Sequence, residues 1–169
     1  MDRRSVLAMG AAAGLGLVPG AVVAQQKSIK EQIVGTWLLV SWVQTRADGS
    51  KNYRFGDNPK GINTFSADGH FSLAQMRGDL PKISSGDPLK PTPEEAVAIV
   101  QGSIAYFGTY TVDEASRTLN VELAGTTLVN QLGTVHKRTI DSIGADEMRY
   151  SNANSVGNLG KIELVWKRA

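Results

Sequence analysis

The stretch Ile33-Val34-Gly35-Thr36-Trp37-Leu38-Leu39-Val40-Ser41-Trp42-Val43 decides the fold class of this sequence. It is apolar and rich in β-branched and aromatic residues, and the turn signal Asp48-Gly49 follows it. This composition predicts a β-strand. Because side chains alternate between the two faces of a strand, an inward-pointing Trp37 would place three more side chains inside: Leu39, Ser41 and Val43.

Seven further strand signals follow along the chain, separated by short stretches rich in turn residues. They cover residues 61–65, 70–76, 104–112, 118–123, 134–143, 147–150 and 161–166. Sequential antiparallel strands on this scale commonly close into a barrel, because closure removes exposed sheet edges. We therefore predict an all-β fold, an antiparallel barrel of roughly eight strands whose interior can hold one small ligand.

One helix interrupts the strands, between the third and the fourth. Thr92 is suited to the N-cap, Pro93 to the first helical position, and Glu95 completes a capping box. Gly102 is suited to ending the helix. The loop that precedes the helix, residues 77–91, is long enough to act as a lid over a pocket.

Composition excludes several classes of protein. Lys and Arg number 18 and Asp and Glu 16, so a net charge of +2 argues against nucleic acid as a partner. The sequence has no cysteine, which excludes disulfides, thiol catalysis and Cys-based metal sites. With only His70 and His136 and no phosphate-binding glycine motif, we expect neither a metal nor a cofactor.

The first 24 residues are predicted to be an export signal rather than part of the fold. Arg3-Arg4 precedes an uncharged stretch from Ser5 to Gln26, and small residues end it near Ala24. The arginine pair resembles a bacterial twin-arginine signal. Cleavage would leave residues 25–169 as one barrel domain in the periplasm with no membrane span. An uncleaved membrane anchor is the alternative, because the uncharged stretch is just long enough to cross a bilayer.

Gly35-Thr36-Trp37 resembles the Gly-x-Trp signature of the lipocalin and fatty-acid-binding superfamily. In that superfamily the tryptophan plugs the closed end of the barrel, often beneath an arginine from the last strand. The resemblance thus assigns Gly35, Trp37 and Arg168 to the base of the barrel. The whole of residues 33–169 resembles the bacterial and fungal lipocalin-like domain family, most of whose members have no assigned function. The segments that carry this resemblance are 34–42, 65–69, 75–77, 92–95, 104–110 and 164–166.

The candidate ligand-binding residues are polar or aromatic side chains on the predicted strands: Ser41, Gln75, Tyr106, Tyr110, His136 and Arg138. Around a cavity, apolar walls would hold a hydrophobic body and these groups would orient it. Arg138 could pair with a carboxylate, and His136, with cationic neighbours, could act as a base. On the alternative interpretation, the tyrosines lie half-buried on the outer sheet surface and Arg138 is solvated.

We favour an exported protein that binds a small hydrophobic or amphipathic molecule. A small barrel enzyme, an isomerase, cyclase or lyase, could use the same pocket, but no residue is assigned as catalytic. The third alternative is a structural or inhibitory envelope protein. The sequence does not specify an oligomeric state.

Overall fold

The computed structural model describes residues 27–153 and 160–169. Two α-helices and a 3-10 helix accompany the strands of this part of the chain. In chain order, the elements are α1 (Ile29–Ile33), β1 (Gly35–Thr45), β2 (Lys51–Asn52), β3 (Lys60–Phe65), β4 (His70–Met76), α2 (Pro93–Gly102), β5 (Ser103–Asp113), β6 (Thr118–Thr126), η1 (Val129–Gln131), β7 (Val135–Ile143), β8 (Glu147–Asn152) and β9 (Lys161–Arg168).

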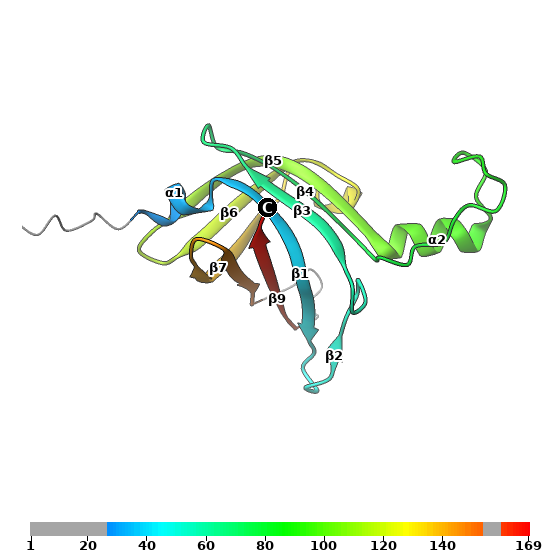
Figure 1. Cartoon of the computed structure of the whole chain (residues 1–169), viewed down its shortest axis with the longest axis horizontal. Coiled ribbons are helices and arrows are strands. Elements are labelled where there is room, and N and C mark those ends of the chain that lie inside the picture. The colour runs from blue at the N-terminus through cyan, green and yellow to red at the C-terminus, as the bar shows by residue number, and fades with distance from the viewer. Residues whose placement is uncertain (1–26, 154–159) are drawn as a thin grey trace, which may run out of the picture.

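The long strands form a closed antiparallel barrel. Each strand from β3 to β9 pairs with its neighbour in sequence, and β1 pairs with β3 on one side and with β9 on the other. The β1–β9 pairing, which includes Trp37 opposite Arg168, closes the sheet. The predicted all-β barrel of about eight strands is therefore confirmed (Figure 1).

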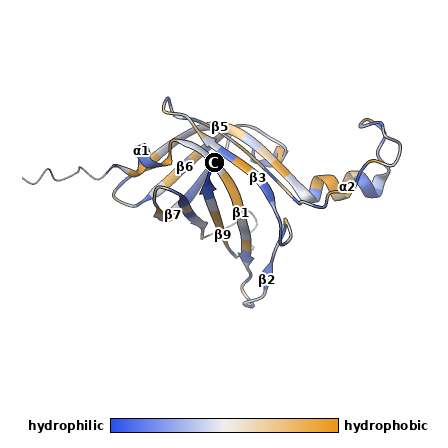
Figure 2. Ribbon diagram, in the orientation of Figure 1, coloured by the Kyte–Doolittle hydropathy of each residue, from blue (hydrophilic) through white to orange (hydrophobic). Residues whose placement is uncertain are grey.

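The helix predicted from the capping box is α2. The Thr92 hydroxyl accepts a hydrogen bond from the Glu95 backbone N–H, the Glu95 carboxylate accepts one from the Thr92 N–H, and Pro93 opens the helix. Its place in the strand order differs by one, since α2 lies between β4 and β5. The cause is β2, a two-residue, polar strand that pairs with the end of β1 and has no apolar signal in the sequence (Figure 2).

The helix α2 and the loop before it project from the side of the barrel (Figure 1). Two hydrogen bonds tie the end of the helix to the barrel: Arg54 Nε donates to the Gln101 carbonyl, and Arg77 N donates to the Gly102 carbonyl. No helix in the described part of the chain is long and apolar enough to cross a membrane. The predicted export signal, residues 1–24, lies outside the described residues.

The barrel core occupies the end that α1 covers. Large side chains from several strands are almost fully buried there, among them Trp37, Phe65, Ile140, Met148 and Trp166. Ile29 and Ile33 of α1 belong to the same cluster. This packing fills one end of the barrel, so that a cavity has room only at the other end.

Candidate functional site

Arg168 and Trp37 close the base of the barrel. The guanidinium Cζ lies 4.1 Å from the centre of the Trp37 ring, a cation–π distance. Its three nitrogens donate to the carbonyls of Gln32, Val34 and Ala145 at 2.7, 3.1 and 2.6 Å. The Trp37 indole N–H donates to the Ile33 carbonyl at 2.8 Å. Arg168 thus links β9 to α1 and to the β7–β8 turn.

Gly35 begins β1 directly beside this cluster. Its φ is +127°, which side chains disfavour, and a Cβ there would lie 2.8 Å from Nη1 of Arg168. We expect Gly35→Ala to lower the free energy of unfolding by about 2–3 kcal/mol, because strain and displacement of Arg168 add. Urea unfolding followed by tryptophan fluorescence measures this loss. Gly144→Ala is the matched control, since a Cβ there has ordinary space; equal losses in the two variants would contradict the explanation.

A cavity of about 820 Å³ opens at the other half of the barrel. Four of the predicted ligand-binding residues line it: Gln75, Tyr106, His136 and Arg138. Apolar walls come from Trp42, Phe55, Ile104, Ile162 and Leu164. No residue between Gln75 and Ile104 lines the cavity, so the predicted lid, residues 77–91, stands aside from it.

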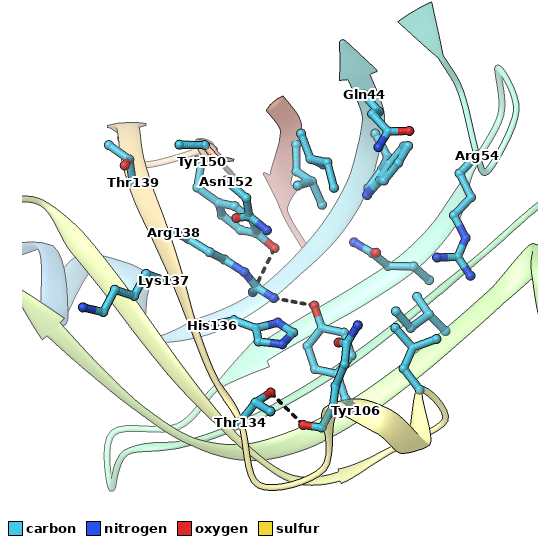
Figure 3. A pocket seen from close by; sticks show the side chains of 18 of the residues that line it. Gln44, Arg54, Tyr106, Thr134, His136, Lys137, Arg138, Thr139, Tyr150 and Asn152 are labelled. Atoms are coloured by element: carbon cyan, nitrogen blue, oxygen red, sulfur yellow. Dashed lines mark hydrogen bonds between the residues drawn. The ribbon is translucent and has the colours of Figure 1, made fainter. Parts of the chain in front are cut away.

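Arg138 lies at the centre of the polar part of the site. It is 3% exposed; Nη2 donates to the Tyr106 hydroxyl at 2.5 Å and Nη1 to the Tyr150 hydroxyl at 3.4 Å (Figure 3). Its Cζ also lies 5.5 and 5.0 Å from the centres of the two rings. Burial lowers the pKa of Arg138, but the two tyrosines raise it by more, so the guanidinium keeps its charge. Burial raises the pKa of Tyr150, whose hydroxyl therefore stays protonated.

Ser41 does not line the cavity, and the expectation that it points inward with Trp37 was wrong. The β1–β9 register shifts between Leu39 and Ser41, where β1 carries a bulge. A bulge adds one residue and reverses the alternation beyond it. Trp42 and Gln44 line the cavity in place of Ser41 and Val43. The sequence contains no local sign of this bulge.

Tyr110 belongs to the core rather than to the cavity. It is 4% exposed, its hydroxyl donates to the Ser66 carbonyl at 2.8 Å, and its ring packs edge-on against Phe65 with 5.0 Å between centroids. Tyr106 and Tyr110 do share one strand face, as alternation requires. They lie at different depths, however, and only Tyr106 reaches the cavity.

Sequence reasoning missed several residues of the wall. Along β8, Met148 and Tyr150 are both buried and lie two residues apart on the same face of the strand, a pattern that indicates an inward position. Arg54 and Phe55 follow β2 in a connection whose sequence gives no signal for their position. Besides the predicted Gln75, five further carboxamides line the cavity: Gln44, Asn52, Asn130, Gln131 and Asn152.

His136 lies half-buried in the cavity wall, with its ring 6.5 Å from that of Tyr106. Burial lowers the pKa of His136, and the charge of Arg138 lowers it further. The imidazole is therefore neutral at pH 7. We expect an NMR titration to give His136 a pKa below the ordinary value of an exposed histidine. Because Arg138→Met removes the repelling charge, the pKa of His136 should rise in that variant; an unchanged value would contradict the assigned contribution of Arg138.

None of the described residues around the cavity has a carboxylate side chain. Elsewhere in residues 27–153 and 160–169, no three His, Asp or Glu side chains gather closely enough to hold a metal ion. The site thus combines one buried cation, two tyrosine hydroxyls and many amides with apolar walls. Such a site can bind and orient an organic molecule.

A closed antiparallel barrel with a plugged base and a cavity at the opposite half defines the class of small-molecule-binding β-barrels. The chain belongs to the lipocalin-like domain family, whose model matches residues 34–169. This confirms the resemblance carried by Gly35-Thr36-Trp37 and the segments that follow it.

Several solved structures resemble the chain, among them the following two. One is a lipocalin-like protein from Bacteroides uniformis, 14% identical, with a TM-score of 0.45 over 82% of this chain and 99% of that one. The other is a redesigned β-barrel, 16% identical, with a TM-score of 0.42 over 85% of this chain and 99% of that one. No match was found among curated proteins.

Proposed function

We propose that this protein is an exported binding protein for a small hydrophobic or amphipathic molecule. The observation that carries the proposal is the composition of the cavity wall. Trp42, Phe55 and Ile162 offer apolar surface, while Arg138 and Tyr106 offer polar groups at a fixed position. A mixed wall of this kind suits a ligand with an apolar body and a polar group.

Support for export comes from the sequence alone. Arg3-Arg4, the uncharged stretch after it and the small residues before Gln25 are typical of a cleaved twin-arginine signal. The absence of cysteine is compatible with an oxidising periplasm. A twin-arginine signal implies folding before export, which would allow the barrel to leave the cytoplasm with a ligand already bound.

The proposal is tested on the full chain, expressed with its leader in a bacterial host and purified from the periplasmic fraction without denaturation. We expect an intact mass that begins at Gln25, and in native mass spectrometry an additional mass that is lost on denaturation. Protein that stays in the cytoplasm with its leader would overturn the export part. A clean apo mass, together with no binding of the neutral fluorescent probe phenylnaphthylamine, would overturn the binding part.

A small barrel enzyme is the second candidate, and His136 is the observation that favours it. A neutral imidazole beside Tyr106 in a partly desolvated cavity is suited to proton transfer. Turnover of an identified bound ligand by the wild-type protein, lost in His136→Ala while binding persists, would favour the enzyme over the binding protein.

A further inference from the structure

Arg138 is a buried cation without a counter-ion among residues 27–153 and 160–169. The carboxylates of the described ion pairs all belong to other partners, and no carboxylate lines the cavity. Taking a charged guanidinium out of water is costly unless it is paired. A protein that keeps this charge at 3% exposure therefore has either a structural need for it or an anion that arrives from outside.

The hydrogen bonds of Arg138 leave donors available to such an anion. Its Nη1 and Nη2 donate to Tyr150 and Tyr106, whereas Nε has no partner among the described residues. Each tyrosine hydroxyl accepts from Arg138, which leaves the hydroxyl proton of Tyr106 free to be donated toward the cavity (Figure 3). Gln75, also 3% exposed and in the cavity wall, has an Nε2 group without a described partner.

The charges around the rest of the cavity also favour an anion. Arg54 lines it without an ion pair to a described carboxylate, whereas the side chain of Lys137, next to Arg138 on β7, points away from it (Figure 3). Arg54 is held in place by its bond to the Gln101 carbonyl and lies over the Phe55 ring at 5.3 Å. A cavity lined by charges of one sign concentrates ions of the opposite sign.

The residues of the cavity wall also limit the size and polarity of the ligand that can bind. The base of the barrel is filled by Trp37, Phe65 and Trp166, none of which lines the cavity, so the ligand has only the mouth half of the barrel. Carboxamides lie among the apolar residues of that half. Nε2 of Gln75 and Oδ1 of Asn152 have no hydrogen-bond partner among the described residues, and a long alkyl chain would leave both without one, which is unfavourable. A compact body with its own polar groups satisfies them.

We propose that Arg138, with Tyr106 and Tyr150, binds the carboxylate or a similar oxyanion of a compact organic acid, the remainder of which contacts the carboxamide-containing wall. The guanidinium fork suits planar oxyanions. This inference rests on the proposed binding function and names the class of ligand. Arg138 would form its ion pair only when the ligand is bound.

The test uses two fluorescent probes with the same ring system. Anilinonaphthalene sulfonate carries an anionic group, and phenylnaphthylamine is its uncharged analogue. We expect the wild-type protein to bind the sulfonate at least about tenfold more tightly, as a hydrogen-bonded charge requires. Binding of neither probe would contradict the proposed function. Equal binding of both would overturn only the anion site.

Substitutions test which residue produces the preference for the sulfonate probe. Arg138→Met should reduce the preference for the sulfonate over phenylnaphthylamine to less than about threefold. Lys137→Gln is the matched control, because it removes an exposed cation at the neighbouring position, and it should keep the preference. A preference that survives Arg138→Met but disappears in Lys137→Gln would overturn the assignment to Arg138. Circular dichroism verifies that each variant is folded.

Competition experiments test whether the cavity prefers a compact acid to a long-chain acid. Naphthoate, a compact ring acid, should displace the sulfonate probe from wild-type protein at lower concentration than palmitate, a long-chain acid. The reverse order would overturn the compact class, although the anion site would stand. Raising the salt concentration should weaken binding of the sulfonate probe and leave binding of phenylnaphthylamine unaffected, since only the charged probe depends on an ionic contact.

Discussion

Trp37→Ala is expected to lower the free energy of unfolding by about 3–5 kcal/mol, the cost of removing a large buried aromatic side chain from a packed core. The side chain is completely buried, and its loss also takes away the ring on which Arg168 stacks and the indole bond to the Ile33 carbonyl. Denaturant unfolding followed by circular dichroism measures the loss.

Trp42→Ala is the control for this effect. Trp42 lies in the same strand but lines the cavity and is only partly buried. We expect this substitution to cost about 1–2 kcal/mol, because a partly solvated side chain has less surface to lose, and to weaken probe binding. A loss as large as that of Trp37→Ala would show that the cavity wall carries as much of the stability as the base does.

Arg138→Met is expected to increase the stability of the unliganded protein, by about 1–3 kcal/mol. Methionine fills much of the same volume without an unpaired charge, and the hydroxyls of Tyr106 and Tyr150 can turn to water in the cavity. The urea midpoint of the apo protein measures the gain. A decrease of more than about 1 kcal/mol would instead assign Arg138 a structural role in the barrel.

The same variant separates stability from binding. An anionic ligand that binds only the folded state raises the stability of the wild-type protein with ligand concentration. In Arg138→Met this increase should disappear although the apo protein is more stable. Arg138→Lys retains the charge and loses the planar fork, so it should show no gain in apo stability.

Much of the fold could be predicted from the sequence because its signals are local. The apolar stretch around Trp37 predicted the first strand, and the capping box around Thr92 and Glu95 predicted the helix, both of which the structure confirms. The short strand β2 was missed, since Lys51 and Asn52 have no apolar pattern and pair only because the end of β1 lies beside them.

The candidate site was less predictable, because its geometry depends on pairings between distant strands. The inward direction of Arg138 is set by its place opposite Leu119 on β6 and by the tyrosines contributed by β5 and β8. Simple alternation failed for Ser41, where the bulge reverses the direction of the side chains. For Tyr110, alternation gave the correct inward direction. It did not show that the ring lies in the core against Phe65 rather than at the cavity.

The bulge in β1 gives a single strand two separable tasks. Before it, Trp37 and Leu39 pack in the core; beyond it, Trp42 and Gln44 line the cavity in the opposite phase. Substitutions beyond the bulge are therefore expected to change the cavity wall with a smaller loss of stability than substitutions before it. A scaffold divided in this way is suited to acquiring new ligands over evolution, with the bulge marking the boundary between the part that must stay constant and the part that is free to diverge.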